Sequence, residues 1–219
     1  MKYSKDHTIY VNQDGIEVPS VTTILKILNK PFLTKWANIM GFRGINVDNV
    51  LEETSRIGTL VHGIVRAFVM KYYYIWIGDY SDKQTVIRYF DSFLSWYKKN
   101  KVEPIFTEQI LVSDRFGGTC DFYGLINDKY TILDYKTSKR FYATMFLQLA
   151  AYCMILESQG KQVDQVAILL LKNKGEAEPK FIQRTELEPY IEAFKKLLDL
   201  FHIWYDLNIK DGWGNILEG

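Results

Sequence analysis

The chain has 219 residues, of which 47% are hydrophobic and 15% aromatic, and its net charge is +1. This composition predicts one well-packed domain, and the balanced charge excludes a protein that binds polyanions through its overall field. The two cysteines are too few for an iron–sulfur cluster or for a zinc site built on cysteine pairs. No apolar stretch approaches the roughly 20 residues of a membrane span, and residues 1–7 lack the apolar region of a signal peptide, so we expect a soluble, cytoplasmic protein.

The N-terminal half is predicted to be a short hairpin followed by helices. Residues 8–18 alternate between apolar and polar around an Asp-Gly pair, which favours a β-hairpin. Ser20 is typical of a helix cap, and a second short helix is expected over about 33–40. Helical spacing of apolar residues then predicts one or two helices over about 47–76 and another over about 82–99.

The period of the pattern changes to two after Pro104, which indicates strands. We expect a three-stranded meander, a helix, two further strands and a last helix. The expected ranges are 105–112, a strand through Asp121, a strand through Asp134, a helix over 143–159, strands over 165–171 and 180–184, and a helix over about 187–208. This order predicts an α/β fold in which helices flank a mixed central sheet.

One domain is expected over residues 1–219. Within it we distinguish a hairpin and helical region, a sheet core, and a C-terminal helix with a tail. Their ranges are 1–103, 104–186 and 187–219.

Two acidic residues and a lysine stand out on the predicted meander. Asp134 and Lys136 are two apart at the end of a strand, so their side chains project to the same face while Tyr135 points elsewhere. Asp121 lies on the preceding strand. Alone, an Asp-x-Lys pair is more often a solvated pair at a strand end; together, these residues indicate a metal site.

Such a site suits phosphodiester hydrolysis. A bound Mg²⁺ or Mn²⁺ acidifies its water and polarises phosphoryl oxygens, and carboxylates are the ligands that these ions prefer. Lys136 would orient the attacking water or neutralise the transition state.

Several motifs resemble the PD-(D/E)XK nuclease superfamily, and most closely its exonuclease branch. Members of that branch are the nuclease domain of the exodeoxyribonuclease V complex, phage exonucleases and the mitochondrial genome maintenance exonuclease. The resemblance rests on the order of Asp121 and Asp134-x-Lys136, together with the stretches Pro19–Leu25, Gly58–His62 and Gln148–Tyr152. It spans most of the chain and implies a restriction-endonuclease-like core with a helical N-terminal half.

The resemblance also implies roles for individual residues. Asp121, Asp134, His62 and the carbonyl of Tyr135 would hold the metal, and Lys136 would be the catalytic lysine. A lone helical histidine is more often structural, and only the motif around His62 favours a ligand. Two uses remain open for Glu108, which is either a second-metal ligand through water or a structural charge near a sheet edge.

Further residues are expected to orient the lysine or contact DNA. Gln148 and Tyr152 are four apart and share one helix face, where they would position Lys136 and the phosphate or simply pack. Phosphate contacts are expected from Lys139, Arg140, Arg66, Ser20 and Thr22. The aromatic run over 71–76 has two possible uses, stacking on unpaired bases and core packing, of which packing is commoner.

The sequence therefore predicts a Mg²⁺- or Mn²⁺-dependent DNA exonuclease that acts on DNA ends or single strands in replication, recombination or repair. A recombinase, a single-strand-binding protein or a helicase would be its partner, in a bacterial or phage-infected cell. The alternatives are a structure-specific endonuclease of the same fold and a nucleic-acid-binding scaffold without turnover.

Overall fold

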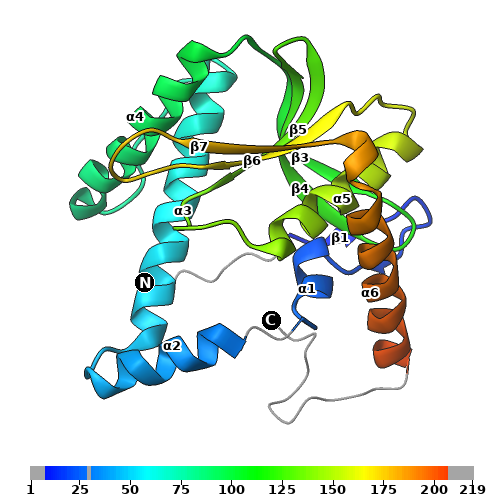
Figure 1. Ribbon diagram of the computed structural model, residues 1–219, viewed down its shortest axis with the longest axis horizontal. Helices are drawn as coiled ribbons and strands as arrows, with labels where there is room; N and C mark the ends of the chain where they lie inside the picture. The colour runs from blue at the N-terminus through cyan, green and yellow to red at the C-terminus, as the bar shows by residue number, and fades with distance from the viewer. Residues whose placement is uncertain (1–7, 29–30, 207–219) are drawn as a thin grey trace.

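The protein folds around a five-stranded mixed β-sheet with helices on both sides (Figure 1). The computed structural model describes residues 8–28 and 31–206. The strands lie in the order β3-β4-β5-β6-β7; β5 and β6 run parallel, and the other neighbours run antiparallel. Their bounds are β3 Val102–Val112, β4 Gly117–Ile126, β5 Lys129–Lys136, β6 Gln165–Leu170 and β7 Glu178–Gln183.

The remaining elements surround this sheet. A two-stranded hairpin precedes the first helices, and two short 3₁₀ turns lead into the later ones. The bounds are β1 Tyr10–Val11, β2 Glu17–Val18, α1 Val21–Leu25, α2 Pro31–Phe42, α3 Val47–Val69, η1 Tyr80–Asp82, α4 Lys83–Lys99, α5 Ala143–Ser158, η2 Arg184–Glu186 and α6 Glu188–Asp206.

A two-residue turn joins β4 to β5. Asn127 and Asp128 both have positive φ angles, of 51° and 64°, as a type I′ hairpin requires. Because the loop length fixes the register, Phe122 lies opposite Leu133. The turn thereby brings together the segments that carry the two aspartates of the predicted site.

The side chains of β5 and β6 alternate between two cores, because successive residues of a strand face opposite sides of the sheet. Ile132 and Ile168 join the core under α1, α5 and α6, whereas Leu133 and Leu169 join the core under α3 and α4. Figure 1 shows α3 beside α4 on one side of the sheet and α5 beside α6 on the other.

Helix α5 is apolar nearly all round. Its residues Leu149, Ala150 and Cys153 are fully buried, because the sheet covers one side of the helix while α1 and α6 cover the other. A helix that is enclosed in this way has little freedom to shift. The polar side chains it carries near β5 are therefore held in fixed positions.

The expected α/β class, with a mixed sheet between helices, is confirmed, and the three-stranded meander forms as predicted. Ser20 caps α1, since its hydroxyl accepts a hydrogen bond of 3.0 Å from the backbone N–H of Thr23. No helix in the described ranges has the length and apolar character that a membrane crossing demands. The expectations for residues 1–7 and for the tail over 207–219 lie outside the described residues.

One predicted range is wrong at its end. The one or two helices expected over about 47–76 are a single helix that ends at Val69, and residues 72–77 belong to no helix or strand. Lys71 has a φ of 56°, and the backbone N–H of Tyr72 donates to the carbonyl of Ala67 at 2.8 Å, so the chain turns back here. The apolar run continues without a Gly or Pro to mark this end, which explains the overextended prediction.

Candidate active site

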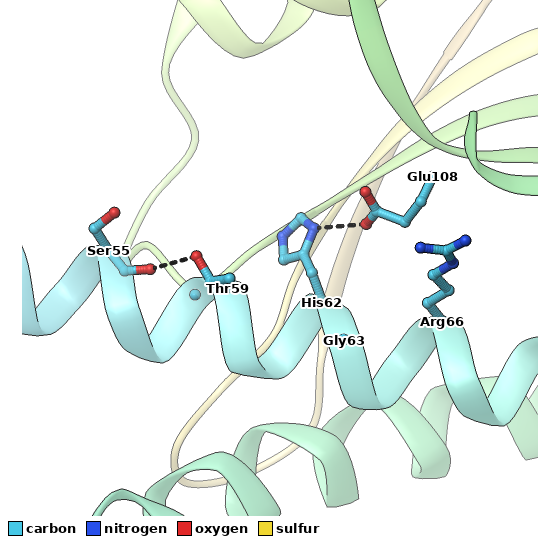
Figure 2. Close-up of a pocket in the computed structure, with 7 residues that line it drawn as sticks. Ser55, Thr59, His62, Gly63, Arg66 and Glu108 are labelled. Carbon is cyan, nitrogen blue, oxygen red and sulfur yellow. Dashed lines mark hydrogen bonds and ion pairs between the residues drawn. The ribbon is translucent and has the colours of Figure 1, made fainter. Parts of the chain in front are cut away.

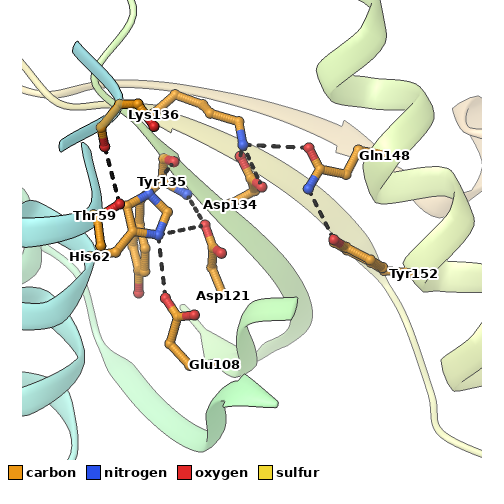
Figure 3. A network of polar contacts seen from close by, with 10 residues as sticks. Thr59, His62, Glu108, Asp121, Asp134, Tyr135, Lys136, Gln148 and Tyr152 are labelled. Carbon is orange, nitrogen blue, oxygen red and sulfur yellow. Dashed lines mark hydrogen bonds and ion pairs between the residues drawn. The ribbon is translucent and has the colours of Figure 1, made fainter. Parts of the chain in front are cut away.

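Three ionisable side chains from three elements meet at one end of the sheet. Nδ1 of His62, on α3, lies 3.3 Å from Oε1 of Glu108 and 3.5 Å from Oδ2 of Asp121. Their potential ligand atoms all lie within 4.8 Å of one another. The other ring nitrogen of His62, Nε2, lies 3.0 Å from the carbonyl oxygen of Tyr135 (Figure 3).

These contacts orient the imidazole. With a proton on each ring nitrogen, His62 donates from Nε2 to the Tyr135 carbonyl and from Nδ1 to Glu108, with Asp121 also close to Nδ1. The backbone N–H of Tyr135 in turn donates to Oδ2 of Asp121 at 2.9 Å, so the backbone of one residue of β5 holds both groups.

Glu108 is held in a strained backbone conformation. It lies within β3, the edge strand of the sheet, with a φ of 49°. The left-handed region costs an L residue roughly 1–2 kcal/mol, and such strain persists only where surrounding structure enforces it. Here the strain turns a carboxylate toward His62, at a distance of 3.3 Å.

A second set of contacts begins at Asp134. Its buried carboxylate pairs with Lys136, whose Nζ donates to Oδ1 at 2.9 Å and lies 2.8 Å from Oδ2. The same Nζ donates to Oε1 of Gln148 at 3.4 Å, and Nε2 of Gln148 donates to the hydroxyl of Tyr152 at 3.0 Å. Figure 3 shows this chain running from β5 to α5. The expected proximity of Gln148 and Tyr152 to the lysine is thus observed.

Gly118 makes room for the end of this chain. A Cβ atom built on Gly118 would lie 2.6 Å from Cε1 of Tyr152 and 3.0 Å from its hydroxyl. Any larger residue would therefore displace the ring.

Opposing charges shift the pKa values of the site. Burial alone would raise the pKa of Asp121, but His62, Lys136 and the Tyr135 amide outweigh it and lower that pKa. Burial raises the pKa of Asp134 to about 6, with a contribution from Asp121 and against the opposing charge of Lys136.

The two basic groups respond to the same carboxylates. Burial alone would lower the pKa of His62, but Asp121 and Glu108 raise it well above its ordinary value. For Lys136, burial likewise works against the charge, and Asp134 and Asp121 nevertheless raise the pKa. The site holds an excess of negative charge that favours a bound cation.

A hollow of about 390 Å³ opens beside His62 along α3 (Figure 2). Arg66 and Glu108 reach into the same region as the imidazole. The lining residues are Ser55, Gly58, Thr59, His62, Gly63, Arg66 and Glu108. The site is therefore open on the α3 side, whereas Asp134 on the α5 side is almost completely buried.

The structure brings together most of the predicted site residues, with one difference in grouping. His62, Glu108 and Asp121 form the close group of possible ligands, while Asp134 turns toward Lys136. The Tyr135 carbonyl faces His62.

The expected phosphate contacts have different surroundings. Lys139 and Arg140 are exposed in the loop after Lys136, and no described residue forms an ion pair with them. Thr22 is exposed on α1, whereas the hydroxyl of Ser20 is used to cap that helix.

Sequence reasoning did not identify the rest of the hollow or the role of Gly118. Thr59 and Ser55 lie one and two turns before His62 on α3, and their helical spacing from the histidine was an available signal, whereas Gly63 directly follows His62. The contact of Gly118 with Tyr152 joins a strand to a helix and has no local signal.

Comparison with protein families gives no match, and neither does comparison with curated proteins. Among solved structures, a phage-related exonuclease from Haemophilus somnus 129PT has 13% identity and a TM-score of 0.36, over 84% of this chain and 95% of that one. An alkaline exonuclease from Laribacter hongkongensis has 10% identity and a TM-score of 0.37, over 87% of this chain and 92% of that one. Likeness at this level does not establish a function, so the site is interpreted from its own residues.

Proposed function

We propose that the protein is a divalent-metal-dependent nuclease that hydrolyses phosphodiester bonds in DNA as an exonuclease. The observation that carries this proposal is the pairing of Lys136 with Asp134 on β5, where the backbone of the residue between them, Tyr135, holds His62 and Asp121. Acidic ligands next to a fixed amine are what the hydrolysis of a phosphodiester at neutral pH requires.

The residues present fit Mg²⁺ or Mn²⁺. Both ions prefer oxygen ligands and accept a site built from a few protein groups with water. The proposed ligands are Asp121, Asp134, His62 and the Tyr135 carbonyl, with Glu108 placed to assist through its contact with His62. When bound, the ion would supply an acidified water and polarise the phosphoryl oxygens.

Lys136 would act on the attacking water and on the charge that develops at phosphorus. Its ammonium is held between Asp134 and Gln148, and Tyr152 holds Gln148 in turn. A group that is positioned before the substrate arrives costs no reorganisation during the reaction. Gln148 and Tyr152 are positioning residues in this account.

DNA would reach the site from the open side of α3. Arg66 lines the hollow there, and Lys139 and Arg140 follow the catalytic strand, so all three are placed to contact phosphates. Thr22 and Ser20, at the start of α1, are proposed as further contacts. We place the protein in DNA replication, recombination or repair in the cytoplasm of a bacterial or phage-infected cell, beside a recombinase, single-strand-binding protein or helicase.

A time course on linear DNA labelled at either end tests the proposal. We expect Mg²⁺-dependent release of short products from the ends and intact, covalently closed circles in a parallel reaction. Cleavage of the circles would instead indicate an endonuclease. Binding of DNA without any Mg²⁺- or Mn²⁺-dependent cleavage would contradict the proposed enzyme and indicate a scaffold.

A further inference from the structure

A segment without helix or strand runs back along α3 after the helix ends. This segment, residues 72–77, is called the aromatic strap below. At its start Tyr72 bonds to the carbonyl of Ala67, and just past its end Asp79 pairs with Arg56 at 2.8 Å. The strap therefore runs antiparallel to α3, from the last turns of the helix toward its middle.

Side chains over residues 73–77 of the strap alternate between exposed and partly buried positions. Tyr74 and Trp76 face the protein, where Trp76 packs against the core under α3 and α4. Tyr73, Ile75 and Ile77 face outward with exposed fractions of 102%, 79% and 76%. Core packing thus explains Tyr74 and Trp76. It does not explain why Tyr73, Ile75 and Ile77 are exposed.

The strap packs next to the hollow beside the candidate active site. A Cβ atom on Gly63 would lie 3.4 Å from Cε2 of Tyr74, and Gly63 also lines the hollow with His62 and Arg66. The strap therefore adjoins the hollow at Gly63.

The hollow also contains a cation that no described residue pairs with. Arg66 is exposed, and no residue within 8–28 or 31–206 forms an ion pair with it. Figure 2 shows Arg66 on the same side of α3 as His62 and Glu108. A volume of about 390 Å³ lies near the lower end of small-ligand sites, which suits one nucleotide unit rather than a duplex.

We propose that the aromatic strap and Arg66 bind an unpaired DNA strand next to the scissile phosphate. Arg66 contacts a phosphate of that strand, and the exposed ring of Tyr73 stacks on a base. This inference rests on the proposed nuclease function and narrows its substrate to a single strand or a frayed end. A positively charged groove beside aromatic rings is the combination that binds single strands without sequence preference.

Binding of a short labelled oligothymidylate in EDTA, which prevents cleavage, tests the strap directly. We expect Tyr73→Ala to weaken this binding roughly tenfold, the effect of losing one stacked base, and to leave duplex binding unchanged. Tyr73→Phe keeps the ring and should bind as the wild type does. Tyr205→Ala is the matched control, because Tyr205 is a similarly exposed tyrosine at 63%, on α6.

A DNA strand made of consecutive abasic positions keeps its phosphates but has no bases. Its binding therefore separates the contribution of stacking from that of charge. Wild type should bind this strand more weakly than oligothymidylate, whereas Tyr73→Ala should bind the two nearly equally. Arg66→Ala should weaken both strands alike and lower the dependence of binding on salt. These three results together would identify a base-stacking strap beside a phosphate contact.

Equal affinity of wild type and Tyr73→Ala for oligothymidylate would overturn the inference. The exposed side chains of Tyr73, Ile75 and Ile77 would then be assigned to contact with a protein partner. If DNA is cleaved with Mg²⁺ while that affinity is unchanged, the proposed function stands and the strap proposal fails. If Tyr73→Ala weakens binding but no cleavage occurs with any divalent cation, the proposed enzyme fails and the strand-binding surface stands.

Discussion

The two halves of the candidate site differ in how completely their charges are paired. The inner half consists of Asp134, Lys136, Gln148 and Tyr152, and the outer half consists of His62, Glu108 and Asp121. In the inner half every polar group lies in one chain of contacts that ends on the enclosed helix α5. In the outer half two carboxylates face one imidazole beside an open hollow, and Glu108 has a strained backbone.

This difference indicates that the two halves of the site have different roles. The inner half is fixed before any ligand arrives, which suits a group that must be in place during the reaction. The outer half has negative charge that a protonated His62 only partly balances, which suits a site that accepts a cation. Each prediction below changes one half and measures what happens to the other.

The largest expected effect comes from removing the amine of the inner half. Lys136→Ala should lower turnover roughly 10²–10³-fold, because one preorganised electrostatic group is lost. Binding of Mn²⁺ should persist, since the outer carboxylates remain. Initial rates on end-labelled DNA and calorimetric titration of Mn²⁺ check the two statements separately.

Lys195→Ala is the control for that experiment, because Lys195 pairs with Glu192 on the surface of α6. It should leave the rate unchanged. A Lys136→Ala variant with a rate near that of the wild type would remove the lysine from the mechanism.

A smaller effect should follow when the inner half is only displaced. In Gly118→Ala the new methyl group would overlap the buried ring of Tyr152, which supports Gln148 and through it Lys136. We expect a roughly tenfold loss of turnover and a loss of about 1–3 kcal/mol of stability from overpacking.

The matched control is Gly41→Ala on α2, where no atom lies within 4 Å of the added Cβ. That variant should be as active as the wild type and equally or more stable, because alanine favours a helix. If Gly118→Ala lowers the melting temperature but leaves turnover and its pH profile unchanged, the contact is structural and the proposed positioning role is wrong.

The smallest effect concerns pH and one group from each half, Asp134 and His62. The folded pKa of Asp134 is raised to about 6 from 3.8, so the stability that its neutral form contributes is full below about 4 and is lost as pH rises through 6. The pKa of His62 is also raised, so its contribution is full below about 6.5 and is lost as pH rises through the raised pKa of the folded protein. A cation binds to the charged form of the Asp134 carboxylate and to the neutral form of the His62 imidazole.

The gain in melting temperature on adding Mg²⁺ should therefore grow as pH rises from about 5 to 8. Taking the difference with and without Mg²⁺ at each pH cancels the titration of groups elsewhere in the protein. A gain that is independent of pH over this range would mean that the ion binds away from these groups.

The local parts of this structure were predictable from sequence. The period-two strands, the turn before β5 and the cap at Ser20 depend on residues a few positions apart, and all are observed. Asp134 and Lys136 share a face because they lie two apart on a strand. These features follow from backbone geometry alone.

The parts that escaped prediction depend on residues far apart in the chain. The strain of Glu108 exists because β3 passes His62 of α3, and the need for glycine at position 118 exists because α5 places Tyr152 there. The end of α3 at Val69 is set by packing of the strap on the helix, against a sequence that continues to be apolar. No local pattern encodes these contacts.

Titration of Mn²⁺ into wild type and Asp121→Asn is the most direct test of the central claim. Asparagine keeps the shape of the side chain and an oxygen that can accept the bond from Tyr135, so the fold should be retained, as circular dichroism would verify. We expect saturable binding by the wild type and at least a tenfold loss of affinity in the variant. Equal binding by both proteins would show that the ion does not bind at this group of residues.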